Sequence, residues 1–169
     1  LGNGDIWTAG DSLDMMGQTG CDGVVVGRGC LGRPWLFGEL SAALAGDPIP
    51  APPSLGEIGE IMSEHVRLLV DHFGERHGIN LFRRHPSWYL KGFPVGREIR
   101  DRFSRVADIA EVDHLVSLLD PDIPFPPEAA QMVRGHSGGA RSVRLPYGFL
   151  DSRHAEGLGR EADLVTSGG

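Results

Sequence analysis

Two short turns near the start of the chain carry residues suited to binding an anion. The first is Asn3-Gly4-Asp5 and the second is Gly27-Arg28. Glycine lets a ligand approach the backbone closely, N–H groups at a helix start attract negative charge, and an arginine fork matches the oxygens of a phosphate. Either turn alone is also explained as a plain connection between a strand and a helix. Because about one strand-and-helix unit separates them, the two together predict a phosphate pocket.

A second concentration of chemistry is electrostatic. The chain of 169 residues has a net charge of −7, yet residues 76–105 hold eight of its 16 Lys and Arg residues and only two acidic ones. The flanking segments 1–75 and 106–169 carry net charges of −8 and −5. A local cluster of positive charge attracts phosphates even on an acidic protein. Residues 76–105 therefore have the charge expected of a phosphate-binding surface.

The two turns fall in a region, residues 1–45, where strand and helix patterns alternate. A strand step at the start is followed by a capping box, Thr8 with Asp11, that begins a helix. The β-branched run at 24–26 is typical of a strand covered on both faces, and a second helical pattern begins near Pro34. This order implies parallel pairing in an α/β fold, whose ligands bind at the carboxyl ends of the strands. Both turns lie at such ends.

The rest of the chain has a different character. Residues 46–55 are rich in proline and indicate an extended linker. Residues 56–120 are expected to form a helical domain, because apolar residues recur at helical spacing from Leu55 as far as Gly78. Residues 121–169 are rich in Pro, Gly and Ser and predict a loosely ordered tail. Further amphipathic segments are expected at 79–92, with an interruption at Pro86, at 97–106 and at 108–119.

Composition excludes several other classes of protein. The chain has no apolar run long enough to cross a membrane and no signal-peptide pattern, so we expect a cytoplasmic protein with no membrane partner. Cys21 and Cys30 lie nine positions apart, without a CxxC motif or partnering histidines. This spacing argues against both a disulfide framework and a zinc site, and we expect no metal.

Three stretches carry a family resemblance. They are NGDI at 3–6, TGCDGVVVGRGCLGRPWLF at 19–37 and RRHPSWYLKG at 83–92. Together they resemble the C-terminal half of a bacterial tRNA-dihydrouridine synthase, of the general type found in actinobacteria. The resemblance covers residues 1 to about 120. The paired turns are likewise similar to the phosphate site of a (β/α)8 barrel, which is built from the loops after its seventh and eighth strands.

The resemblance implies an α/β fold, the C-terminal end of a TIM (β/α)8 barrel, followed by a mainly α-helical domain. In this family the barrel binds FMN and the helical domain docks tRNA. NADPH reduces the flavin, which passes hydride to a uridine to give 5,6-dihydrouridine. Residues 1–45 would be the last βα units of the barrel, and residues 56–120 the tRNA-binding domain. At the matching positions the FMN phosphate would be held by Asn3, Gly4, Asp5, Gly27 and Arg28.

The same resemblance gives the basic segment a partner. Positive side chains on a helical face would neutralise phosphates of the tRNA backbone, which supplies most of the affinity for RNA. His85, Trp88 and Tyr89 could stack on a base or ribose. Trp88 and Tyr89, at helical spacing from Leu81, are more often core residues than stacking platforms. The residues assigned to the tRNA contact are Arg83, Arg84, Lys91, Arg97 and Arg100, with Arg102 and Arg105 beside them.

A complete barrel needs about 250 residues. We therefore expect this chain to be the C-terminal part of a longer, monomeric enzyme. The family's catalytic cysteine is expected upstream. Cys21 and Cys30 precede and follow the last strand, in the phosphate-binding region, so neither matches it and no catalytic residue is assigned.

Two alternative functions remain open at this point. The chain could be an RNA-binding module without activity of its own. It could also come from another FMN barrel oxidoreductase that acts on a small molecule, but such an enzyme predicts no basic cluster after the barrel.

Overall fold

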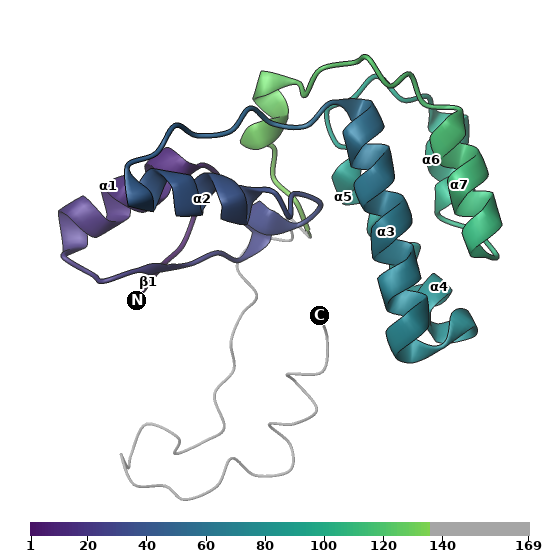
Figure 1. Cartoon of the computed structure of the whole chain (residues 1–169), viewed down its shortest axis with the longest axis horizontal. Coiled ribbons are helices and arrows are strands. Elements are labelled where there is room, and N and C mark those ends of the chain that lie inside the picture. The colour runs from purple at the N-terminus through teal and green to yellow at the C-terminus, as the bar shows by residue number, and fades with distance from the viewer. Residues whose placement is uncertain (136–169) are drawn as a thin grey trace, which may run out of the picture. The chain divides into compact units, whose positions relative to one another are not determined.

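A computed structural model describes residues 1–135, so most of the predicted tail, 136–169, lies outside the described residues. The N-terminal part begins with strand β1 (Gly2–Asn3), helix α1 (Ala9–Thr19) and strand β2 (Val24–Val25). A 3-10 turn, η1 (Arg28–Cys30), leads into helix α2 (Leu36–Ala45) (Figure 1). β1 and β2 pair in parallel, as the alternating pattern predicts. In the described part of the chain these two strands are the whole sheet, and they do not close a barrel.

Helix α1 begins at the capping box that the sequence indicates. The Thr8 side chain accepts a hydrogen bond from the backbone N–H of Asp11, and the Asp11 carboxylate accepts one from the N–H of Thr8 at 2.7 Å. This reciprocal capping box satisfies N–H groups that lack a partner inside the helix. At the other end Gly20 has a positive φ of 68°, which glycine adopts without a steric penalty.

The strand at 24–26 differs from its prediction. The valine run predicts a strand covered on both faces, but the side chain of Val25 is 49% exposed. Within the described residues the sheet has only two strands, and helix α1 is the helix that packs against both of them. A strand in such a small sheet cannot be buried on both faces.

Five helices form the next part of the chain. They are α3 (Leu55–Phe73), α4 (Glu75–Phe82), α5 (Pro86–Tyr89), α6 (Arg97–Phe103) and α7 (Ile109–Ser117). Helix α3 is the centre of this group and packs against both α4 and α7 (Figure 1). Fully buried core side chains come from every one of these helices except α5, which adds the nearly buried Tyr89. They include Leu55, Ile58, Met62, Val66, Phe82, Phe103, Val112 and Leu115.

The end of α3 comes earlier than predicted. The helical pattern runs on to Gly78, but α3 ends at Phe73, and Gly74 takes a positive φ of 78°. Helix α4 then folds back on α3, and a Cβ atom at Gly78 would lie 2.6 Å from the carbonyl oxygen of Leu69. Gly78 is therefore a close-packing residue rather than a helix stop. The predicted interruption at Pro86 is confirmed, since Pro86 is the first residue of α5.

The segment before Gly135 is ordered against the core, although its composition predicts a loose tail. A 3-10 turn, η2 (Pro127–Ala130), lies in this segment. Phe125 is 7% exposed and Ala129 is fully buried in the core of the helical part. The backbone N–H of Leu55 donates to the carbonyl oxygen of Ile123 at 2.8 Å. The tail prediction thus fails for 121–135, and its remainder lies outside the described residues.

Two further findings concern possible partners. None of the described helices is long and apolar enough to cross a membrane. Among residues 1–135, no group of three or more His, Cys, Asp or Glu side chains is arranged to hold a metal ion. Cys21 and Cys30 are free thiols.

Candidate functional site

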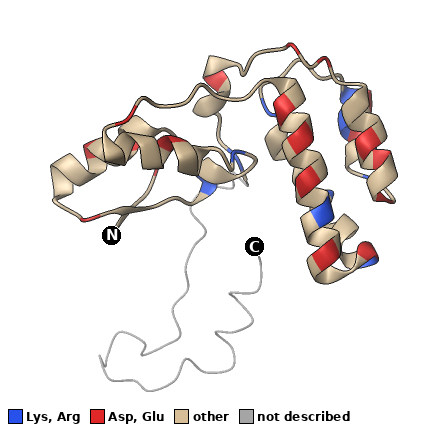
Figure 2. Cartoon of the chain, in the orientation of Figure 1, with Lys and Arg blue, Asp and Glu red and all other residues tan. Residues whose placement is uncertain are grey.

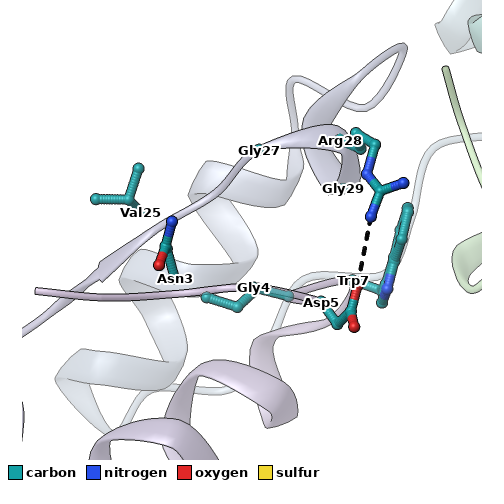
Figure 3. A pocket seen from close by; sticks show the side chains of 9 residues that line it. Asn3, Gly4, Asp5, Trp7, Val25, Gly27, Arg28 and Gly29 are labelled. Atoms are coloured by element: carbon teal, nitrogen blue, oxygen red, sulfur yellow. Dashed lines mark ion pairs between the residues drawn. The ribbon is translucent and has the colours of Figure 1, made fainter. Parts of the chain in front are cut away.

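The two glycine turns meet at one cavity of about 440 Å³ (Figure 3). β1 and β2 lie side by side with Asn3 opposite Val25, so the turns that follow the two strands begin at the same edge of the sheet. The cavity is lined by all five residues that the sequence assigns to phosphate binding, Asn3, Gly4, Asp5, Gly27 and Arg28, together with Ile6, Trp7, Val25 and Gly29.

Backbone geometry keeps this cavity open. Gly4 has a φ of 112° and Asp5 a φ of 44°, both in the left-handed region. A Cβ atom built on Gly4 or on Gly27 would meet no other atom within 4 Å, so a ligand can approach the backbone there. Gly29 has the opposite role, because a Cβ atom on it would lie 2.0 Å from the carbonyl oxygen of Ile6. Only glycine at this position lets the second turn pack against the first.

Arg28 and Asp5 form an ion pair across the mouth of the cavity. The Arg28 Nη2 atom lies 3.6 Å from Asp5 Oδ1, and the two side chains are 54% and 82% exposed (Figure 3). The guanidinium carbon of Arg28 also lies 5.9 Å from the centre of the Trp7 ring. An ion pair this exposed adds little to stability. The ion pair instead positions the Arg28 guanidinium at the mouth of the cavity, where most of its N–H donors remain free to bind a ligand.

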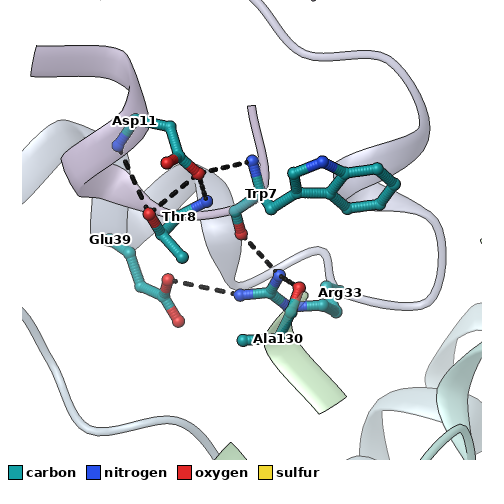
Figure 4. Close-up of polar contacts among 6 residues, drawn as sticks. All are labelled: Trp7, Thr8, Asp11, Arg33, Glu39 and Ala130. Carbon is teal, nitrogen blue, oxygen red and sulfur yellow. Dashed lines mark hydrogen bonds and ion pairs between the residues drawn. The ribbon is translucent and has the colours of Figure 1, made fainter. Parts of the chain in front are cut away.

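Arg33 was not predicted as a site residue, yet it holds the end of the first turn through a hydrogen bond to the carbonyl oxygen of Trp7. Its side chain is 3% exposed, and Nη1 donates to the carbonyl oxygens of Trp7 at 2.6 Å and Ala130 at 3.0 Å (Figure 4). Nη2 lies 3.6 Å from Oε2 of Glu39. Burial lowers the pKa of Arg33, and the Glu39 carboxylate partly offsets this. Arg33 therefore ties the turn to α2 and η2, a role that depends on partners 26 and 97 positions away.

The basic residues assigned to RNA fall into two groups. Arg84 and Arg97 are exposed and make no side-chain hydrogen bond or ion pair to any residue in the described part of the chain. By contrast, Nε and Nη2 of Arg100 donate to three backbone carbonyl oxygens, those of Leu90, Phe93 and Val95. Such bonds give Arg100 a structural role in holding the loop before α6.

Arg83 and Lys91 are intermediate between these groups. Nε of Arg83 donates to the carbonyl oxygen of Val106 at 2.9 Å, and Nζ of Lys91 donates to that of Val133. Both side chains are partly buried, and each retains further donors. In Figure 2 the basic residues of α6 form a blue patch, whereas acidic residues run along α3, including Glu60 and Glu64. A polyanion would therefore favour α6 and the loop before α5 over α3.

The aromatic residues of the basic segment are mostly packed inside. Tyr89 is 4% exposed, and its hydroxyl oxygen lies 3.0 Å from Nδ1 of His65. The His85 ring lies between those of His65, at 4.5 Å, and Trp88, at 5.1 Å. Tyr89 is thus a core residue, as one of the two sequence interpretations holds, and it cannot stack on a base.

Comparison with known proteins identifies the family. The model of the family described as dihydrouridine synthase (Dus) matches residues 1–122. A probable tRNA-dihydrouridine synthase of Mycobacterium leprae is 52% identical over 169 residues, which is 100% of this chain and 44% of the relative. A tRNA-dihydrouridine synthase B of Pseudomonas putida is 38% identical over 107 residues, covering 63% of this chain and 32% of the relative. The chain belongs to the dihydrouridine synthase family.

A second mycobacterial relative, from strain H37Rv of Mycobacterium tuberculosis, has the same printed name. It is 51% identical over 173 residues, which cover 100% of this chain and 43% of the relative. The chain thus spans less than half the length of the mycobacterial relatives that it matches. The resemblance drawn from the three sequence stretches is confirmed.

Proposed function

We propose that this chain is the C-terminal part of a tRNA-dihydrouridine synthase, which uses FMN and NADPH to reduce uridines of tRNA to 5,6-dihydrouridine. Residues 1–45 supply the end of an FMN-binding barrel, and residues 56–120 supply the tRNA-binding domain. The observation that carries the proposal is the meeting of two glycine turns and Arg28 around one cavity. Family membership supplies the reaction.

Support for FMN binding comes from the shape and donors of the cavity. A volume of about 440 Å³ accepts a phosphate and the carbons next to it, and the open backbone at Gly4 and Gly27 admits phosphate oxygens. Arg28 supplies charge-assisted hydrogen bonds. The carboxylate of Asp5 would repel a phosphate at contact distance, so its role is to orient Arg28, and its oxygens can accept hydrogen bonds from hydroxyl groups of the ligand.

The division of labour follows from this arrangement. FMN, when bound, supplies the hydride chemistry, and the protein supplies binding and orientation. Asn3 and the two turns hold the phosphate end, and Arg33 fixes the first turn through the carbonyl oxygen of Trp7. Because Gly29 sets the approach of the two turns, the spacing of the phosphate donors depends on it.

Support for tRNA binding comes from charge and exposure. Arg84 and Arg97 are exposed, and their side chains bind no other residue among 1–135. Arg83 and Lys91 are partly buried, and each has N–H donors beyond the one bonded to a backbone carbonyl oxygen. Contacts of this kind neutralise RNA phosphates and lose affinity steeply as salt rises. Arg100 acts at this surface through the loop that it braces.

The decisive experiment uses the complete protein. We expect it to purify with a yellow flavin and to form dihydrouridine in tRNA that lacks the modification, when NADPH is supplied. Arg28→Ala should weaken FMN binding, whereas Arg105→Ala, at an exposed residue two positions after the end of α6, should leave it unchanged. A colourless protein without product would overturn the proposal. A protein that binds tRNA in a salt-dependent manner but makes no product would instead favour the RNA-binding module without activity.

A further inference from the structure

Glycine at position 32 lets the loop between β2 and α2 pack directly on helix α5. A Cβ atom built on Gly32 would lie 2.4 Å from the carbonyl carbon of Trp88 and 2.5 Å from the backbone nitrogen of Tyr89. Because both are backbone atoms, no side-chain rotation can make room for a larger residue. Gly32 also has a φ of 65°, in the left-handed region that glycine adopts without a steric penalty. The loop and α5 therefore meet backbone to backbone, and the contact requires glycine.

This contact joins the two binding sites of the proposed function. Arg28, which lines the cavity between the glycine turns, lies on the same loop as Gly32. Arg84 and Lys91, both assigned to the tRNA contact, lie just before and just after α5. Both segments belong to the described residues, so the contact does not depend on how much surface the rest of the complete protein covers.

Helix α5 is held in place by the other helices. The Tyr89 hydroxyl oxygen lies 3.0 Å from Nδ1 of His65 in α3, and the His85 ring lies 4.5 Å from the same histidine ring. Leu90 is fully buried, and its carbonyl oxygen accepts a hydrogen bond from Nη2 of Arg100 at 2.8 Å. A methyl group added at position 32 would therefore displace the loop, with the strand that it follows, rather than α5.

A second connection joins the same two sites. Nζ of Lys91 donates to the carbonyl oxygen of Val133. Two positions later, a Cβ atom on Gly135 would lie 3.8 Å from Cδ of Arg28, which is ordinary van der Waals contact. The segment 133–135 thus runs from the end of α5 to the side chain of Arg28. Together with the contact at Gly32, it holds α5 and Arg28 in one arrangement.

We infer that Gly32 is a positioning residue for the reaction, because its contact with α5 sets where bound tRNA lies relative to the flavin. This inference rests on the proposed function. The flavin phosphate is anchored on the loop side of the contact, at Arg28, and the tRNA backbone on the other side, at Arg84 and Lys91. Ordinary contact begins at 3.4 Å, so a methyl group placed 2.4 Å from Trp88 requires a displacement of about 1 Å. A misplacement of about 1 Å can slow a reaction about 100-fold.

The test separates the two half-reactions of the complete protein in Gly32→Ala, with FMN supplied in excess. Loss of flavin absorbance on addition of NADPH does not involve RNA and should occur at the rate of the unaltered protein. Recovery of the absorbance on addition of a saturating unmodified tRNA transcript should be slowed, by up to about 100-fold. Recovery with dioxygen should be unchanged. The affinity for tRNA should also be unchanged, because the variant removes no phosphate contact.

Gly46→Ala is the matched control. Gly46 has a φ of 77°, but a Cβ atom there would meet nothing within 4 Å, so the variant has similar backbone strain without the clash. Hydrogen exchange gives a readout that is independent of turnover. The backbone amides of residues 86–91 should exchange faster in Gly32→Ala than in Gly46→Ala, with or without FMN, since α5 loses close packing on one side.

Tyr89→Phe is the second variant, and it decides the question if Gly32→Ala does not fold. It loosens α5 from α3 without adding an atom to the loop. It should slow the recovery with tRNA and leave the loss of absorbance with NADPH unchanged. An unchanged recovery with tRNA in Tyr89→Phe would then overturn the inference.

The remaining outcomes separate this inference from the proposed function. Equal rates of recovery with tRNA in Gly32→Ala and Gly46→Ala, or equal slowing of both half-reactions in Gly32→Ala, overturn the inference alone. So does a slowing that disappears once tRNA is saturating. An unaltered protein whose flavin absorbance does not recover with tRNA would overturn the proposed function, and this inference with it.

Discussion

The hydroxyl oxygen of Tyr89 lies 3.0 Å from Nδ1 of His65, and this contact joins α5 to α3. It explains why Tyr89 is a core residue and does not stack on a base. The Tyr89 hydroxyl bonds to a residue inside the protein. Arg84, five residues earlier, is exposed, and its side chain makes no hydrogen bond or ion pair to the described residues. Within residues 84–89, Tyr89 therefore stabilises the packing of α5 on α3, whereas the positive charge of Arg84 faces solvent.

Tyr89 should titrate far above an ordinary tyrosine, because burial raises its pKa to about 12. The chain has two tyrosines, so the absorbance change near 295 nm in the unaltered protein minus that in Tyr89→Phe reports Tyr89 alone. The same variant should lose about 1 kcal/mol of unfolding free energy, as expected for one buried hydrogen bond. A difference titration centred near pH 10 would show that Tyr89 is exposed.

His85 should make the protein less stable in mild acid. Its folded pKa of about 4 is below the ordinary value of 6.5, so between these pH values the unfolded chain binds more protons than the folded one. Unfolding free energy should therefore fall as pH drops from about 6.5 towards 4, with no contribution from His85 above that window. The pKa of His65 is also lowered by burial and acts in the same direction.

The measurement for His85 is urea unfolding at pH 5 and at pH 7, in the unaltered protein and in His85→Asn. The asparagine removes the proton-binding group, so the difference between the two pH values should shrink. An unchanged difference would assign the acid sensitivity to other groups.

Gly29→Ala should disrupt the cavity between the glycine turns. The new methyl group would lie 2.0 Å from the carbonyl oxygen of Ile6, so the turns must move apart. We expect a loss of about 1–3 kcal/mol of stability, together with weaker retention of flavin. Gly38→Ala is the control, because a Cβ atom there meets nothing within 4 Å. Gly38 lies in the first turn of α2, so its replacement by alanine should stabilise the protein by less than about 1 kcal/mol. Equal stability of the two variants would contradict the close approach.

Arg33→Met should be among the most damaging substitutions in the chain. It leaves the carbonyl oxygens of Trp7 and Ala130 and the carboxylate of Glu39 without their buried partner. The expected loss is about 3 kcal/mol or more. Arg105→Ala breaks an ion pair with Asp101 whose side chains are 77% and 56% exposed, and it should change stability by less than about 0.5 kcal/mol. Thermal unfolding of both variants checks the contrast.

Much of the local structure follows from nearby residues. The capping box at Thr8 joins positions three apart, so it could be recognised in the sequence, and α1 starts where it predicts. The order of strand, helix, strand and helix follows from periodicity. It also placed both glycine turns at strand ends, which is why all five residues assigned to the phosphate site line one cavity.

What the sequence could not indicate depends on contacts between distant positions. The residues around Arg33, a glycine and a proline, do not indicate that its side chain is buried. Its hydrogen bond to the carbonyl oxygen of Ala130 forms only in the folded protein. Arg134 is likewise 1% exposed, in a stretch whose composition predicts a loose tail. Burial of such residues is decided by long-range packing, which leaves no periodic signal in the nearby sequence.

By itself, the sequence determined the helix starts, the strand-and-helix order, the charge of 76–105 and the family. These properties depend on side chains a few positions apart or on composition, and their physics is local. Only the tertiary structure decided that Arg100 braces a loop, that Tyr89 faces inward and that Gly32 packs on α5. Those outcomes require segments far apart in the chain to meet, because burial and hydrogen-bond partners exist only once the chain has folded.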